Sequence, residues 1–146
     1  MSNLHIACDH AGFACKEELK TSLHTALKDL GLTLVDHGTN GTESCDYPIF
    51  AEEACKAVEA EGSMGLLICG TGIGMSMVAN RHQGIRAALC TTELHARLAR
   101  RHNNANVLCL GARMTGIELA RAIVLAFFSE NFEGGRHQRR IDLFSK

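Results

Sequence analysis

The sequence has little net charge, no long apolar run and no paired cysteine motif. Its 146 residues carry a formal net charge of -1, which gives no bulk attraction to nucleic acid or to an anionic membrane. Its apolar stretches are all too short to cross a bilayer. The first residues show no basic segment leading into an apolar one, so we expect no signal peptide and a cytoplasmic location.

The spacings of cysteine and histidine that are typical of metal sites are missing as well. The chain has seven cysteines, an odd number with no C-x-x-C pair, which argues against a disulfide framework and against a zinc knuckle. Most of them lie in apolar runs and are expected to pack as small core residues. The eight histidines show no two- or three-ligand spacing. We therefore expect no metal and no other cofactor.

Short apolar runs alternate with segments of helical periodicity along the whole chain. Strands are predicted at residues 4–8, 32–36, 65–69, 85–90 and 106–110. Helices are predicted at residues 12–30, 48–61, 92–102 and 115–129, with a short additional helix that ends near residue 81. This alternation predicts one α/β domain over residues 1–146, a Rossmann-like three-layer sandwich with a five-stranded parallel sheet and helices on both faces.

Polar residues follow three of the predicted strands directly. Asp9 and His10 follow the first strand, residues 69–74 follow the third, and Arg113 follows the fifth. In open parallel sheets, ligands bind beyond the carboxyl ends of the strands. We therefore expect these groups to converge on one edge of the sheet.

The segment Cys69-Gly70-Thr71-Gly72-Ile73-Gly74 is a glycine-rich turn between a strand and a helix. Backbone N–H groups in such a turn form a nest that stabilises a phosphate or a developing oxyanion. A nucleotide P-loop would continue with Lys and then Ser or Thr, whereas Met75-Ser76 follows here. The glycine spacing also differs from the dinucleotide fingerprint. Met75 stands where a cysteine phosphatase loop is expected to carry an arginine.

Cys69 lies immediately before this nest. The helix dipole and the N–H groups should favour its thiolate, which makes it a usable base or nucleophile. Thr71 is expected to hydrogen-bond the sulfur. A buried thiol that only packs beneath the turn explains the position equally well.

The other polar candidates also have two interpretations each. Asp9 and His10 suit the binding of sugar hydroxyls and proton transfer, or the closing of the helix that follows. Asp46 is expected to cap a helix, with Tyr47 as a lid or stacking group. His102 ends a helix, where the dipole favours its protonated form, so it is either a general acid or a cap.

The tail leaves the last predicted helix through two glycines and then carries three arginines. Arg136 and Arg140 are four residues apart, so they share a face if the tail is helical. Together with Arg113 they could hold a phosphate, because the guanidinium fork matches phosphate oxygens. The alternative for the tail is a solvated basic face.

These residues fall into ordered blocks that run nearly from end to end. The main blocks are Cys8-Asp9-His10-Ala11-Gly12-Phe13, Asp46-Tyr47-Pro48, residues 68–74, residues 101–107, Gly111-Ala112-Arg113 and residues 134–140. In these blocks the chain resembles the B-type ribose-5-phosphate isomerase family, which also includes the galactose-6-phosphate isomerase subunits.

The resemblance implies roles for individual residues. The implied catalytic set is Cys69, Thr71 and His102, with Cys69 as the base and His102 as the acid that helps to open the furanose ring. The implied substrate-binding positions are Asp9, His10, Tyr47, Gly70, Thr71, Gly72, Ile73, Gly74 and Asn103. The implied phosphate ligands are Arg113, Arg136 and Arg140. The family also implies a homodimer, or a dimer of dimers, whose shared sites residues 131–146 would reach.

The implied activity is the metal-free interconversion of ribose 5-phosphate and ribulose 5-phosphate in the pentose phosphate pathway, through a cis-enediolate. The loop amides would hold the enediolate oxygen and the arginines the phosphate. One alternative is a six-carbon substrate such as allose or galactose 6-phosphate. A non-catalytic sugar-phosphate sensor on the same fold is another, although Cys69 and His102 are both retained.

Overall fold

The computed structural model describes residues 1–145. Its strands are β1 (Ser2–Cys8), β2 (Leu32–Asp36), β3 (Met64–Cys69), β4 (Ala87–Leu89) and β5 (Val107–Gly111). Its helices are α1 (Phe13–Ser22), α2 (His24–Asp29), α3 (Tyr47–Glu61), α4 (Ile73–Ala79), α5 (Glu93–Asn103), α6 (Ile117–Ser129) and α7 (Arg136–Asp142). Within the described residues, no helix is both long enough and apolar enough to cross a membrane.

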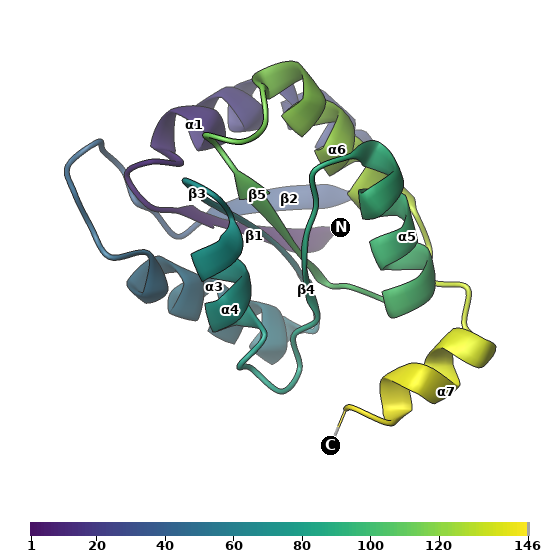
Figure 1. Ribbon diagram of the computed structural model, residues 1–146. Coiled ribbons are helices and arrows are strands. Elements are labelled where there is room, and N and C mark those ends of the chain that lie inside the picture. Colours follow the sequence, from purple (N-terminus) through teal and green to yellow (C-terminus); the bar gives the residue numbers. More distant parts are fainter. Residues whose placement is uncertain (146) are drawn as a thin grey trace.

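The five strands form one parallel sheet in the order β2-β1-β3-β5-β4 (Figure 1). After β1 the chain adds β2 on one side and then returns to place β3 on the other side. The strand order therefore reverses between β1 and β3, which is the kind of position where open α/β sheets bind ligands. The predicted fold class is confirmed.

Alternate side chains of the central strands point to opposite faces of the sheet. Ile68 and Leu108 belong to a core cluster that includes residues of α1, α2, α5 and α6. Leu67 and Cys69 belong to a second cluster, which they share with residues of α3 and α4. Figure 1 shows these two groups of helices on opposite sides of the sheet. The period of two along β3 thus directs the Cys69 side chain towards α3 and α4.

The single helix predicted over residues 12–30 is two helices, α1 and α2, joined at Leu23. The hydroxyl of Thr21 donates a hydrogen bond to the carbonyl of Glu17, and the hydroxyl of Ser22 donates one to the carbonyl of Glu18. Such bonds to a carbonyl one turn back compete with the regular helical pattern and bend helices. The sequence prediction was wrong here because it followed the apolar periodicity alone.

Strand β4 is shorter than the predicted residues 85–90. The side chain of Asn80 pairs with both the N–H and the C=O of Ala87. The N–H of Arg86 donates to the side chain of Asn106. Asn80 thus covers the outer edge of Ala87, which lies inside β4, whereas the Asn106 side chain takes the Arg86 N–H that a longer ladder would use. Three residues remain in this edge strand.

The tail turns back towards the end of α5 and finishes in α7 (Figure 1). The tail is helical over α7, the condition under which Arg136 and Arg140 were expected to share a face, and the two lie one turn apart on it. His137 and Ile141 of this helix are buried. Helix α7 is therefore anchored by two inward side chains while its arginines stay exposed.

Candidate active site

The turn between β3 and α4 holds the sulfur of Cys69 by a backbone contact. The Gly72 N–H donates a hydrogen bond to Cys69 Sγ over 3.1 Å, and the Cys69 side chain is almost completely buried. The Thr71 side chain makes no hydrogen bond to the sulfur, contrary to the sequence prediction. Its exposed hydroxyl instead accepts a hydrogen bond from the Ile73 N–H at 3.2 Å. The turn itself supplies the sulfur's donor, because Gly72 folds back in a left-handed conformation with φ of 78°.

Glycine is required at two places in this turn. A Cβ on Gly72 would lie 2.5 Å from a methyl carbon of Leu89, in addition to the strain of its positive φ. A Cβ on Gly74 would lie 2.5 Å from the ring of Tyr47. The Tyr47 ring, at the start of α3, therefore packs directly on the first turn of α4.

The turn is also fastened to the segment that follows β5. The Ala112 N–H donates to the carbonyl of Cys69 at 2.8 Å, and the Arg113 N–H donates to the carbonyl of Gly70 at 2.9 Å. The guanidinium of Arg113 lies over Gly70, since a Cβ there would be 3.1 Å from Nη1. Within residues 1–145, Arg113 forms no salt bridge with a carboxylate. Its charge is therefore available to an anion at this edge.

Asp9 and His10 lie next to the turn, beyond the end of β1. The Asp9 N–H donates to the carbonyl of Ile68 at 3.2 Å, which continues the pairing of β1 with β3. The buried carboxylate of Asp9 accepts the N–H of Gly12 at 3.1 Å. His10 Nδ1 accepts the N–H of Cys45 at 3.2 Å, so this nitrogen carries no proton and Nε2 is the donor.

The capping predictions have mixed outcomes. Asp9 closes the turn before α1, although the N-cap residue of that helix is Gly12. Asp46 is the N-cap residue of α3, but its side chain makes no capping hydrogen bond. The predicted side-chain cap at Asp46 is therefore wrong. Pro48 lies in the first turn of α3 and favours a helix start through its fixed φ, which lessens the need for a cap.

The convergence predicted from the strand ends is confirmed. Cys69, Asp9 and Arg113 follow three adjacent parallel strands, and Tyr47 reaches the same edge from α3. This edge combines a buried thiol, a buried carboxylate, an imidazole and a guanidinium with the N–H groups of a helix start. Such a set suits binding of an anionic, hydroxylated ligand and transfer of a proton.

His102 and Asn103 lie at the opposite side of the sheet, where the parallel strands begin, and not at their carboxyl ends. They end α5 just before β5 begins at Val107, whereas Cys69 pairs with Gly111 at the other end of β5. The four residue steps between these ends span about 13 Å. His102 stacks on His137, with ring centroids 4.2 Å apart, and its Nε2 lies 3.7 Å from a carboxylate oxygen of Glu133. Within one chain, His102, Arg136 and Arg140 therefore do not share a site with Cys69.

Sequence reasoning missed the neighbours of His102. Glu133 and His137 come from the tail, some 30 residues further along the chain. The histidine spacings give no sign of this cluster, because its members meet only where the tail turns back to the end of α5. Three side chains that can each offer one metal ligand thus lie together: His102, Glu133 and His137.

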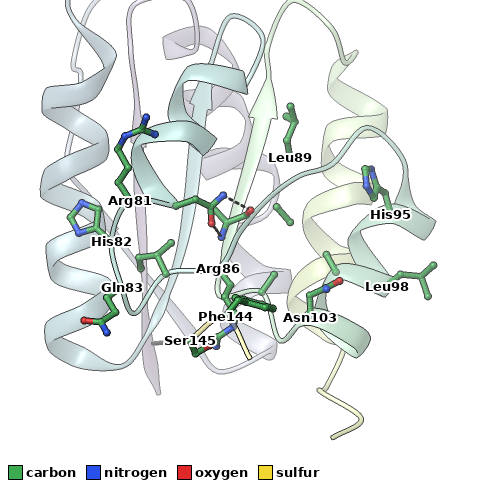
Figure 2. Close-up of a pocket in the computed structure, with 16 residues that line it drawn as sticks. Arg81, His82, Gln83, Arg86, Leu89, His95, Leu98, Asn103, Phe144 and Ser145 are labelled. Carbon is green, nitrogen blue, oxygen red and sulfur yellow. Dashed lines mark hydrogen bonds between the residues drawn. The ribbon is translucent and has the colours of Figure 1, made fainter. Parts of the chain in front are cut away.

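An open groove of about 840 Å³ lies beside the edge strand β4. Figure 2 shows Arg81, His82 and Gln83 on one wall and Leu98 and Asn103 on the other. Phe144 and Ser145 close one end of it. The groove contains one predicted site residue, Asn103, and lacks Cys69. In a single chain, the groove beside β4 is thus separate from the Cys69 thiol.

Known proteins resemble this chain over nearly all of its length. A curated relative, ribose-5-phosphate isomerase B of Escherichia coli, is 43% identical and aligned over 97% of this chain and 93% of its own length. A ribose 5-phosphate isomerase from Thermotoga maritima has a solved structure with a TM-score of 0.92 and 48% identity, covering 99% and 97% of the two chains.

A structure of ribose-5-phosphate isomerase B from Mycoplasma genitalium, described with bound ribulose-5-phosphate, has a TM-score of 0.89. It is 44% identical and covers 97% of this chain and 92% of its own. The model of the Ribose/Galactose Isomerase family matches residues 4–144. Sequence, fold and family model agree, and the chain belongs to the Ribose/Galactose Isomerase family.

Proposed function

We propose that this chain interconverts ribose 5-phosphate and ribulose 5-phosphate. The observation that carries the proposal is the buried Cys69 thiol, which receives the Gly72 N–H at the start of a helix and lies at the ligand-binding edge of the sheet. Family membership and the ribulose-5-phosphate described in the Mycoplasma genitalium relative support the same substrate class.

In the proposed reaction the Cys69 thiolate removes the proton from C2 of the open-chain aldose. The electrons form a C1–C2 double bond, and negative charge develops on O1. N–H groups of the turn formed by residues 70–74 stabilise this oxyanion, because the first turn of α4 has donors without intrahelical acceptors. The Gly72 N–H donates to Cys69 Sγ and the Ile73 N–H to Thr71, so the oxyanion is assigned to the other amides of the turn. The proton returns from Cys69 to C1, and the O2 hydroxyl proton passes to O1, which leaves a carbonyl at C2 and gives the ketose. His102 protonates the ring oxygen in the preceding ring opening.

We assign the phosphate to Arg113, Arg136 and Arg140. None of the three forms a salt bridge within residues 1–145, so each can offer its guanidinium to an anion. Binding energy at this remote group orients the reacting carbons at Cys69. The remaining substrate contacts are assigned to Asp9, His10, Tyr47 and Asn103.

The proposed site needs two subunits. Cys69 and His102 lie at opposite edges of the same sheet, so the acid and the base of one reaction must come from different copies of the chain. Large apolar side chains are exposed on the elements that border the β4 groove, among them Met77, Leu94 and Phe144. We propose a homodimer, or a dimer of dimers, in which the tail of residues 131–146 contributes to the site of its partner.

The proposal includes a reaction without a metal and a cytoplasmic location. The mechanism uses only the thiol, the imidazole, the backbone amides and the arginines. Every cysteine of the chain is a free thiol, which suits a reducing compartment.

The decisive experiment is a turnover assay of the purified chain with ribose 5-phosphate in EDTA. Ketose formation is expected at the same rate with and without the chelator. Allose 6-phosphate and galactose 6-phosphate are assayed in parallel, and ribose 5-phosphate is expected to have the highest kcat/KM. Absence of turnover, or loss of turnover with EDTA, contradicts the proposal. A higher kcat/KM for a hexose phosphate assigns the chain to that substrate instead.

A further inference from the structure

Three potential metal ligands meet where the tail returns to the end of α5. Glu133 Oε2 lies 3.7 Å from His102 Nε2 and 3.6 Å from His137 Nε2. One ligand atom from each of the three residues lies within 4.8 Å of the others. Each of the two imidazoles therefore directs its Nε2 atom at the same carboxylate oxygen, Oε2 of Glu133.

Arg101 fixes the orientation of that carboxylate. Its Nε and Nη2 atoms both lie 2.6 Å from Glu133 Oε1, on the side away from the histidines. The Glu133 N–H also donates to the carbonyl of Arg101 at 3.0 Å, which holds the backbone. Oε2 is thus left directed at the two imidazoles. A hydrogen-bonded partner on the second oxygen is the arrangement that orients carboxylate ligands in metal sites.

We propose that His102, Glu133 and His137 bind a divalent transition-metal ion of the zinc class, and that this ion inhibits the enzyme by occupying His102. Two imidazoles and one carboxylate match the ligand preference of Zn²⁺, and three protein ligands leave a fourth position open to water or a phosphate oxygen. The inhibitory part rests on the proposed isomerase function, whereas the binding part does not.

The separations fit an ion after a small closure. Ligand atoms of a tetrahedral zinc lie roughly 3.4 Å apart, as follows from metal–ligand distances of about 2.1 Å. The two distances to Glu133 exceed this by a few tenths of an ångström. The imidazole planes are only 11° from parallel, so both rings must tilt towards the ion. His102 lies in the last turn of α5, and His137 follows two glycines with positive φ at the start of α7, so the tilt falls at helix ends.

Ion binding would have two effects on the proposed reaction. The Nε2 lone pair of His102 would coordinate the ion, so this nitrogen could neither carry nor deliver a proton. The ion would also tie the tail to α5 and restrict the helix that carries Arg136 and Arg140. The enzyme would thus work without a metal and be inhibited by one.

Direct binding is tested with Co²⁺, whose visible absorption reports coordination. The full-length chain, freed of metal by dialysis, is titrated with CoCl2 and then with ZnCl2, which should displace the cobalt at one equivalent per chain. Thiolate-to-cobalt charge-transfer absorption is recorded as well, because it separates binding by cysteine from binding by histidine. The variants His137→Ala and Glu133→Gln should lose the cobalt bands. Arg101→Gln keeps all three ligands and should bind about tenfold more weakly.

His95→Ala is the matched control, because His95 is exposed on the same helix but lies outside the cluster. It should bind Co²⁺ like the unmodified chain. Isomerase rates with ribose 5-phosphate are then measured with and without ZnCl2, each variant relative to its own rate in EDTA. Zinc should inhibit the unmodified chain and His95→Ala, and inhibit His137→Ala at least about tenfold less potently.

The outcomes separate this site from the proposed activity. Cobalt bands that are absent, that survive His137→Ala, or that show only thiolate coordination overturn the metal site. Binding without inhibition overturns the capture of His102. If the chain shows no isomerase activity but binds Co²⁺ through these residues, the proposed function fails while the metal site stands.

Discussion

The backbone N–H of Gly72 lies 3.1 Å from the sulfur of Cys69 and donates a hydrogen bond to it. The sulfur is otherwise enclosed by an apolar cluster that includes Leu67 and Met75. A thiolate in such surroundings depends on the few donors that reach it. The Gly72 amide and the start of α4 supply this support from the backbone, independently of side-chain rotamers.

Cys69→Ser should therefore abolish proton transfer. A serine hydroxyl occupies a similar volume but does not ionise in the neutral range, so kcat for ribose 5-phosphate should fall by about 10²-fold or more. The dissociation constant from titration calorimetry should change only a few-fold. Cys15→Ser, on α1 and outside the residues assigned to the site, is the control and should retain its kcat. Full activity of Cys69→Ser would place the base at another residue.

Gly72→Ala and Gly31→Ala form a matched pair. Both glycines have positive φ, 78° and 76°, but an added Cβ has no neighbour within 4 Å at Gly31 and meets Leu89 at 2.5 Å at Gly72. Gly31→Ala should lower the free energy of unfolding by about 1 kcal/mol and leave kcat unchanged. Gly72→Ala should cost more stability and also lower kcat, because the donor to the sulfur moves. Urea denaturation and steady-state kinetics measure the two effects. Equal kcat values for the pair would contradict a role for this amide.

Neutral substitution of the phosphate arginines should weaken substrate binding. Arg136→Gln and Arg140→Gln each remove a charged donor, so KM should rise roughly tenfold or more. Arg139→Gln changes the charge of the same helix by the same amount and should leave KM nearly unchanged. Equal effects at all three positions would indicate general electrostatic attraction in place of a defined phosphate site.

Mixtures of two inactive variants should regain activity. If Cys69 of one subunit works with His102 of its partner, a dimer of Cys69→Ala with His102→Ala contains one intact site and one site without either group. Random exchange of subunits then restores about one quarter of the unmodified activity, because half of the dimers are mixed. The assay is turnover of ribose 5-phosphate after dissociation and reassociation. Activity no higher than that of the separate variants would place both groups in one chain.

The pair formed by Lys16 and Asp36 should make stability depend on acid pH. The Lys16 ammonium is fully buried and lies 2.6 Å from an Asp36 oxygen, while Lys20 contacts the other oxygen at 2.6 Å. Burial alone would raise the pKa of Asp36, but hydrogen bonds from both lysines and from the Gly38 N–H outweigh burial and lower it.

A carboxyl whose pKa is lowered on folding stabilises the fold above its unfolded pKa of about 3.9, and this contribution is lost as pH falls through the folded pKa. Asp36→Asn should lower the free energy of unfolding by about 3 kcal/mol at neutral pH, since it leaves the Lys16 charge unpaired. The deficit should shrink as the pH is lowered towards about 2. Urea titrations at several pH values measure it, with the exposed Asp29→Asn as control. A deficit that does not change with pH would show that the ion pair is not its source.

The positions of Cys69, Asp9 and Arg113 could be predicted from the sequence because one rule governs them. Residues that follow parallel strands must meet at one edge of the sheet. The strands themselves can be recognised in the sequence as short apolar runs. His102 precedes a strand, so its place at the opposite edge follows from the same rule once the boundary of β5 is known.

The details that escaped prediction depend on contacts between segments far apart in the chain. The partner of the Cys69 sulfur is a backbone amide set by the loop conformation, and no side-chain pattern reveals it. Glu133 reaches His102 only because the tail turns back after α6. The break at Leu23 arises from two hydroxyls that compete for helix carbonyls, a local effect that periodicity does not register.

The bonds from Ala112 to Cys69 and from Arg113 to Gly70 extend the sheet pairing past the ends of β3 and β5. The reactive thiol therefore moves only if the centre of the sheet moves, and this tightly bonded turn tolerates little change. The segment of residues 40–46 crosses the same edge with mostly exposed side chains, and its Cys45 amide holds His10. A longer sugar needs a wider site. Insertions and substitutions in residues 40–46 can widen it most easily, because they leave the thiol in place.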